Sequence, residues 1–214
     1  MVNSKSHRYW DKNSAIYYSA ESRKSSIINE IQHKINKIYF KKGVFEDIRE
    51  NFLASTPNGI RLMQFLDEKD FNKIKEKVSK LKFKMHYEPE KRSYSKTNSP
   101  KELSELIFLF AEKLLNIKTR IYLTELLKLS HKDYIVLTNK SSRKSLLLIF
   151  DFNDSLKDEG GYISIVLNNQ EISRIHHYAN SLSIASLPKN SKYFIKYVNH
   201  YAREESLHFL KISV

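Results

Sequence analysis

Short apolar runs separated by polar breaks fill the second half of the chain, and their pattern predicts β-strands. The three clearest runs cover residues 134–137, 146–152 and 162–167 and are rich in β-branched and aromatic side chains. Gly160-Gly161 precedes the third run, where a positive φ or a close approach of another segment is expected. The full set of predicted strands is 120–127, 133–138, 145–152, 161–167, 171–175, 181–187, 192–198 and 207–214. Eight strands after a helical half predict an α+β chain, a jelly roll with helices packed against one face.

The first half of the chain has helical periodicity. Apolar side chains recur at three- and four-residue spacing over residues 22–40, which predicts a helix, and a second helix is predicted after Gly43. Asp67 begins a third helix, with acidic residues in its first turn, as the helix dipole favours. A short strand over 60–66 and a loop over 82–98 flank this third helix.

The sharpest local signal is a helix start at Ser99. Ser99 can cap the helix, Pro100 suits the first helical position, and Glu102 can reach back as the third residue of a capping box. The helix is predicted to end near Asn116. Its buried face is expected to consist of Leu103, Leu106, Ile107, Phe110 and Leu114.

The sequence Thr56-Pro57-Asn58-Gly59 has the chemistry of a turn and predicts a boundary. We expect an N-terminal arm and helical extension over residues 1–56 and a jelly-roll domain over 57–214. The 214 residues are 41% apolar, which suffices for one core of this size. No run approaches eighteen apolar residues, and the first thirty residues lack a signal-peptide core. A soluble, cytoplasmic protein without membrane contact is therefore expected.

Composition excludes several kinds of chemistry. The chain has no cysteine, which excludes disulfides, thiolate catalysis and cysteine-based metal sites. Its four glycines fit neither a P-loop nor a dinucleotide-binding loop. The acidic residues between 151 and 159 are expected to lie in a solvated loop.

The chain is strongly basic, with a formal net charge of +13 spread over its whole length. Such an excess favours contact with a polyanion such as RNA or a ribonucleoprotein, and it also keeps proteins soluble. The segment 193–201 interleaves aromatic residues with Lys196 and His200, which suits an RNA-binding face. The same alternation is what a half-buried strand requires. A protein partner is the other alternative.

The order of these features resembles the prolyl-hydroxylase-like branch of the iron(II)/2-oxoglutarate dioxygenases. The resemblance rests on Asp133-Tyr134, the strand end Asp151-Phe152-Asn153, the Gly160-Gly161 pair and residues 180–184. It covers the chain from about Arg61 onward. It implies a double-stranded β-helix and, in active members, iron(II) with 2-oxoglutarate.

A site of that kind needs two histidines and one carboxylate on one face of the metal. The resemblance places Thr138 at the first histidine, Lys140 at the acid and Tyr193 at the second histidine. None of these binds iron(II), and Lys140 adds positive charge beside a cation. Arg203, ten residues after Tyr193, is the candidate cation for the keto acid. We therefore expect no metal and no cofactor, and a non-catalytic binding module.

A displaced metal site is the alternative. His131-Lys132-Asp133 has the His-x-Asp spacing, and His200 follows downstream. These ligands would give an active iron(II)/2-oxoglutarate hydroxylase acting on a protein or nucleic-acid substrate. In the opposing interpretation Asp133 ends a turn and the histidines are solvated or half-buried.

Overall fold

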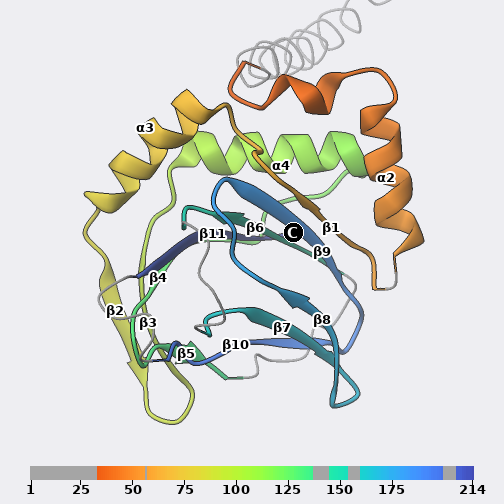
Figure 1. The fold of residues 1–214 in the computed structure, drawn as a ribbon. Helices are drawn as coiled ribbons and strands as arrows, with labels where there is room; N and C mark the ends of the chain where they lie inside the picture. Colours follow the sequence, from red (N-terminus) through yellow and green to blue (C-terminus); the bar gives the residue numbers. More distant parts are fainter. Residues whose placement is uncertain (1–32, 56, 137–144, 154–159, 200–205) are drawn as a thin grey trace, which may run out of the picture.

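The computed structural model describes residues 33–55, 57–136, 145–153, 160–199 and 206–214 (Figure 1). The described helices are the 3₁₀-helix η1 (Lys37–Phe40), α2 (Val44–Ala54), α3 (Glu68–Ser79) and α4 (Lys101–Leu115). The described strands are β1 (Gly59–Leu62), β2 (Lys84–Glu88), β3 (Arg92–Thr97), β4 (Leu123–Leu129), β5 (Tyr134–Ile135), β6 (Ser145–Asp151), β7 (Ile163–Leu167), β8 (Gln170–Ile175), β9 (Ser181–Leu187), β10 (Lys192–Ile195) and β11 (Leu207–Ser213).

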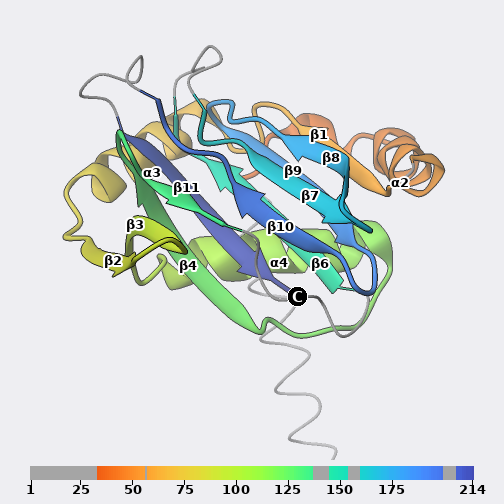
Figure 2. The same cartoon turned by 90° about the horizontal axis from the view of Figure 1, so that it is seen from below.

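The strands form one curled antiparallel sheet with two walls. The order β1-β9-β6-β11-β4 makes the first wall, here called the major sheet, and β5-β10-β7-β8 makes the minor sheet. Strand β3 joins the walls because it pairs with β4 through Ser95–Thr97 and with β5 through Arg92 and Ser93. The helices lie outside the major sheet, with α4 across it (Figures 1 and 2). The predicted α+β jelly roll, a double-stranded β-helix with packed helices, is confirmed.

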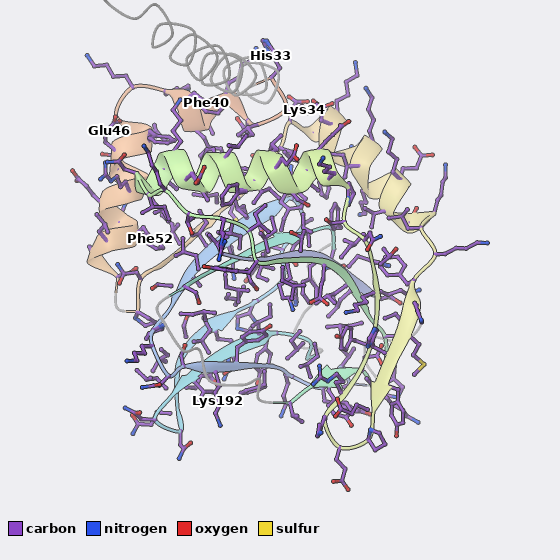
Figure 3. All side chains as sticks on the ribbon, turned by 180° about the vertical axis from the view of Figure 1, so that it is seen from behind. His33, Lys34, Phe40, Glu46, Phe52 and Lys192 are labelled. Atoms are coloured by element: carbon purple, nitrogen blue, oxygen red, sulfur yellow. The ribbon has the colours of Figure 1, made fainter. Side chains whose placement is uncertain are left out.

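Alternation along each strand divides the apolar side chains between two cores. On β6, Leu148 and Phe150 pack toward the helices, while Leu147 and Ile149 face the space between the sheets. This is the period of two that a strand imposes. The first core contains the predicted buried face of α4, whose Phe110 packs edge-on against Phe65 with 5.0 Å between ring centroids. Figure 3 shows side chains in the space between α4 and the major sheet.

Three local predictions are wrong. The helix predicted over 22–40 is absent from its described part, because Ile35 forms a bridge with Leu66 and only Lys37–Phe40 are helical, as 3₁₀. The loop predicted over 82–98 is a hairpin of β2 and β3. The capping box does not form: Pro100 is the N-cap of α4, and the Ser99 hydroxyl accepts a hydrogen bond from Ser104.

Other helix signals are confirmed. Asp67 caps α3 by accepting a hydrogen bond from the Lys69 N–H, and α2 follows Gly43. Phe52 of α2 lies in the same core as α4, so residues on both sides of the predicted boundary at 56 pack together. The division into two parts stays a prediction. In the described part of the chain, no helix has the length and apolarity to span a membrane.

Candidate ligand site inside the barrel

The position predicted for a second metal-binding histidine faces the space between the sheets. Tyr193 lies on β10, two residues from the buried Ile195, and packs against the inner core. Its hydroxyl accepts a hydrogen bond from the Lys211 ammonium at 3.2 Å. Lys211 comes from β11, so the side chains of the two sheets meet here.

Glu125 on β4 connects this pair to a second lysine. One carboxylate oxygen lies 2.7 Å from the Lys211 ammonium and the other 2.7 Å from that of Lys96. The Lys211 side chain is 6% exposed, that of Glu125 10%, and that of Lys96 32%. The group of Lys96, Glu125, Tyr193 and Lys211 is called the Lys211 cluster below.

Both charges at the centre of the Lys211 cluster persist despite burial. Burial acts to raise the pKa of Glu125, but Lys211 and Lys96 outweigh it and lower that pKa. Burial likewise acts to lower the pKa of Lys211, while Tyr193 and Glu125 raise it. Two ammonium groups and one carboxylate leave the cluster with a net charge of +1.

The Lys211 cluster suits an anion better than a metal ion. An ammonium beside the Tyr193 hydroxyl repels a divalent cation, and no group of three histidine or acidic side chains gathers anywhere in the described residues. A keto acid, by contrast, needs a cation for its far carboxylate. Lys211 is a cation on the last strand and faces the barrel interior.

Sequence reasoning missed Lys211 because it placed this cation at Arg203. The available signal was the alternation 207, 209, 211 on one face of a strand, where a single lysine follows Leu207 and Phe209. A lysine at an inward position requires a partner, and Glu125 occupies the facing position on β4.

Most of the other predicted site residues lie outside the described residues. Thr138 and Lys140 belong to 137–144, and His200 and Arg203 belong to 200–205. The displaced site of His131, Asp133 and His200 therefore stays a prediction.

Two members of that displaced site are described and lie in the turn between β4 and β5. The Asp133 carboxylate accepts hydrogen bonds from the Ser93 hydroxyl (2.6 Å) and the Ser130 N–H (2.8 Å). The half-buried His131 ring lies 6.1 Å from the Tyr197 ring. These contacts tie Asp133 into a turn.

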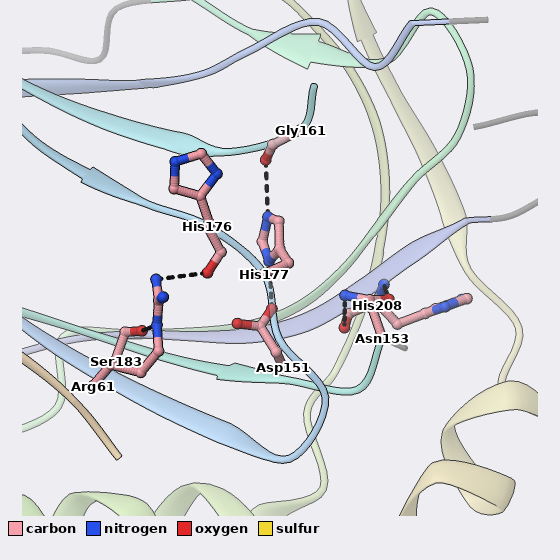
Figure 4. Close-up of polar contacts among 8 residues, drawn as sticks. All are labelled: Arg61, Asp151, Asn153, Gly161, His176, His177, Ser183 and His208. Atoms are coloured by element: carbon pink, nitrogen blue, oxygen red, sulfur yellow. Dashed lines mark hydrogen bonds and ion pairs between the residues drawn. The ribbon is translucent and has the colours of Figure 1, made fainter. Parts of the chain in front are cut away.

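A second buried polar group lies on the same inner face. Asp151, predicted to be solvated, is fully buried and pairs with His177 Nδ1, while His177 Nε2 donates to the Gly161 carbonyl at 2.9 Å (Figure 4). Burial acts to lower the pKa of His177, but Asp151 outweighs it and raises that pKa. Both ring nitrogens face acceptors, which suits the doubly protonated imidazolium.

Arg61 lies near this group on the edge strand β1. Its Nε donates to the Ser183 hydroxyl (3.2 Å) and its Nη2 to the His176 carbonyl (2.8 Å), so it links β1 and β9 to the segment after β8 (Figure 4). The Phe209 ring packs on His177 at 4.8 Å, between the two polar groups along β11. Among the described residues, the barrel interior thus contains two fixed polar groups in an apolar lining.

The architecture is shared with solved oxygenases. A "2OG-Fe(II) oxygenase family" oxidoreductase from Burkholderia pseudomallei has a TM-score of 0.58 at 9% identity, over 81% of this chain and 91% of that one. A Trichoplax adhaerens prolyl hydroxylase in complex with a hypoxia inducible factor peptide fragment has a TM-score of 0.58 at 8% identity, over 79% and 88%. A viral collagen prolyl hydroxylase from Paramecium Bursaria Chlorella virus-1, in its 2OG complex, has a TM-score of 0.53 at 10% identity, over 72% and 94%.

No family model and no curated protein sequence matches the chain. At these low identities the likeness establishes the fold, and the predicted resemblance to the prolyl-hydroxylase-like oxygenases is confirmed in that sense.

The expectation that the chain needs no cofactor is contradicted. The similar Burkholderia protein is a 2OG-Fe(II) oxygenase family member, and the viral prolyl hydroxylase was solved with 2-oxoglutarate. The expectation was wrong because it judged the site from three positions, Thr138, Lys140 and Tyr193. It overlooked Lys211, which supplies the kind of cation that a keto acid requires.

Proposed function

We propose that this chain is a non-catalytic binding protein built on the 2-oxoglutarate oxygenase fold, and that its Lys211 cluster binds a small dicarboxylate of the 2-oxoglutarate kind. The observation that carries the proposal is the net charge of +1 on Lys96, Glu125 and Lys211, of which Glu125 and Lys211 are buried and Lys96 is 32% exposed. Such a cation excess attracts an anionic ligand, and the attraction is stronger than in bulk water where the site is partly shielded from solvent.

Within the described part of the chain, Lys211 keeps a donor for such a ligand. An ammonium has three N–H donors, and Glu125 and Tyr193 account for two. Lys96 is the most exposed member of the cluster and supplies the second positive charge. The ligand would thus be held by charge from Lys96 and Lys211, with Tyr193 bordering it.

The non-catalytic part of the proposal rests on Tyr193. Its hydroxyl is a hydrogen-bond partner of an ammonium, and in that state it is a poor ligand for iron(II). Hydroxylation of a substrate at this position is therefore not expected. The alternative, a working hydroxylase, requires the displaced ligands His131, Asp133 and His200.

Anaerobic calorimetry tests the proposal. We expect 2-oxoglutarate to bind the protein without metal, with no gain in affinity on adding manganese(II) or iron(II). Lys211→Met should weaken the binding at least tenfold, while Lys73→Met on the exposed face of α3 should leave it unchanged.

Two results would overturn this function. Metal binding that 2-oxoglutarate strengthens would establish the displaced site and an active oxygenase. Absence of 2-oxoglutarate binding with and without metal would remove the ligand altogether.

The macromolecular partner is a separate matter. The net charge of +13 favours RNA or a ribonucleoprotein. The Trichoplax prolyl hydroxylase, whose structure is similar, was solved with a peptide fragment, and this supports a protein partner for the chain. A cytoplasmic location stays a prediction.

A further inference from the structure

A row of four isoleucines fixes which side chains of the minor sheet face outward. Ile135, Ile195, Ile163 and Ile175 are register neighbours across β5, β10, β7 and β8, and all four are buried in the inner core. Because side chains alternate along a strand, the residues on either side of each isoleucine face outward.

These outward residues form two rows that contain aromatic and basic side chains together with Val136 and the buried Ser164. One row crosses the four strands as Tyr134, Lys196, Tyr162 and His176, and the other as Val136, Phe194, Ser164 and Arg174. We call this surface, together with the adjoining Tyr197, the outer face of the minor sheet. No described helix covers it, since α2, α3 and α4 all lie beyond the major sheet (Figures 1 and 2).

On this face a guanidinium packs over one aromatic ring, and a second ring lies tilted by 40° beside it. The Arg174 guanidinium lies over the Tyr162 ring at 4.4 Å from its centroid, and the Tyr162 ring is 5.5 Å from that of His176. On the neighbouring strands a hollow of about 600 Å³ is lined by Tyr134, Ile135, Val136, Phe194, Ile195, Lys196 and Tyr197. Tyr197 and Val136 are 42% and 41% exposed.

The charge of the same face is positive. Lys192 and Lys196 on β10 and Arg174 on β8 project from it, and Lys192 lies far from the helices in Figure 3. Lys132 lies in the turn before β5 and is exposed. The acidic residue of β8, Glu171, is held by Arg174 through two contacts of 2.7 and 3.0 Å. Among the described residues around the rings, cations therefore outnumber acids.

We propose that the outer face of the minor sheet binds single-stranded RNA. Aromatic rings set beside cations are the usual platform for unpaired bases: the rings stack the bases and the cations contact the phosphates. An acidic peptide would use the cations but gain little from the rings, and a duplex would hide its bases from them. The proposal is independent of the dicarboxylate site, because the Lys211 cluster lies between the two sheets, on the opposite side of the minor sheet from this outer face.

Fluorescence anisotropy with a labelled twelve-nucleotide single-stranded RNA tests the proposal over a salt series. Tyr197→Ala should weaken binding roughly fivefold or more while leaving the salt slope unchanged. Lys196→Gln should reduce the slope of log K against log salt by about 0.7, the value for one phosphate contact of a single strand. Matched controls are Tyr87→Ala, an exposed tyrosine on β2, and Lys73→Gln on α3. Tyr87→Ala should leave the affinity unchanged. Lys73→Gln should change it only by the small long-range effect of removing one positive charge.

Several outcomes would overturn the assignment. They are no binding at low salt, equal losses in test and control variants, tighter binding of a duplex or of a matched DNA strand, and preferential binding of a polyglutamate peptide. Circular dichroism melts of Tyr197→Ala and Lys196→Gln should match the unaltered chain, so that a loss of binding reports the surface. Loss of RNA binding with retained 2-oxoglutarate binding would reject this inference alone.

Discussion

The Lys211 ammonium lies 3.2 Å from the Tyr193 hydroxyl. This contact joins β11, the C-terminal strand, to β10, the strand predicted to carry a metal ligand. Glu125 neutralises one of the two lysines beside it. The stability of the barrel therefore depends on a carboxylate that sequence reasoning did not single out.

Replacing Glu125 with glutamine should strongly destabilise the fold. The Lys211 side chain is 6% exposed, and an amide cannot neutralise its charge. Breaking a buried pair in this way costs about 3–5 kcal/mol. Urea unfolding gives the free energy of unfolding. As a control, Glu76→Gln breaks an exposed pair with Lys80 and should cost less than about 1 kcal/mol. Equal losses in the two variants would contradict the prediction.

Two histidines should give the stability opposite dependences on pH. The folded pKa of His177 is raised, so its contribution is complete below the unfolded value of 6.5 and is lost as pH rises through the folded pKa. Burial, helped by Lys128, lowers the pKa of His208 to about 4, so stability is lost as pH falls from 6.5 toward 4.

Urea unfolding between pH 4 and 9 measures both effects. His177→Gln should flatten the decline above pH 6.5, and His208→Gln should flatten the decline below it. The decline in stability above pH 6.5 should persist in His208→Gln, and the decline below pH 6.5 should persist in His177→Gln. Loss of both declines in one variant would refute the assignment.

Gly160→Ala should destabilise the protein more than Gly43→Ala. Both glycines have positive φ, 86° and 87°, so each alanine bears the same backbone strain of about 1 kcal/mol or more. A Cβ at Gly160 would lie 2.0 Å from the Tyr197 carbonyl oxygen, while Gly43 has open space. Thermal melting should show a clearly larger drop for Gly160→Ala, and similar drops would argue against the close approach.

Asn180→Ala should uncouple the chain before α3 from β9. The Asn180 side chain accepts from the Leu66 N–H (2.9 Å) and donates to the Leu66 carbonyl (2.8 Å), both buried. Losing two buried hydrogen bonds and leaving both backbone groups unpaired costs about 2–4 kcal/mol. Chemical unfolding measures this, and hydrogen exchange should show faster exchange at the Leu66 amide. Asn180→Gly also removes both hydrogen bonds, but glycine tolerates the positive φ of 52°. It should therefore be more stable than Asn180→Ala only by the backbone strain that alanine bears.

The strands could be predicted from sequence wherever one face is apolar. Residues 181–187 form β9 with the predicted limits, because alternation and turn residues mark both ends. The hairpin of β2 and β3 was missed because its strands carry lysines, serines and exposed Met85 and Tyr87, so no apolar face identifies them. Its strand character comes from pairing with β4 and β5.

The site was harder to predict because distant segments build it. Lys96, Glu125, Tyr193 and Lys211 come from four strands, and single-sequence spacing rules connect none of them. Asp151 was expected in solvent because more acids follow it, yet its position on β6 directs it inward, where His177 compensates the burial. Periodicity fixes the face that a residue occupies, while partner identity depends on strand register.

The central place of β11 has a consequence for synthesis. Strand β11 pairs with β4 on one side and β6 on the other, yet the ribosome makes it about 80 residues after β4, which takes roughly 4–16 s at 5–20 residues per second. During that interval the facing edges of β4 and β6 offer open hydrogen-bonding groups beside apolar side chains. Nascent chains are therefore most exposed to misassociation before residues 207–213 emerge, and the demand for chaperones should peak then.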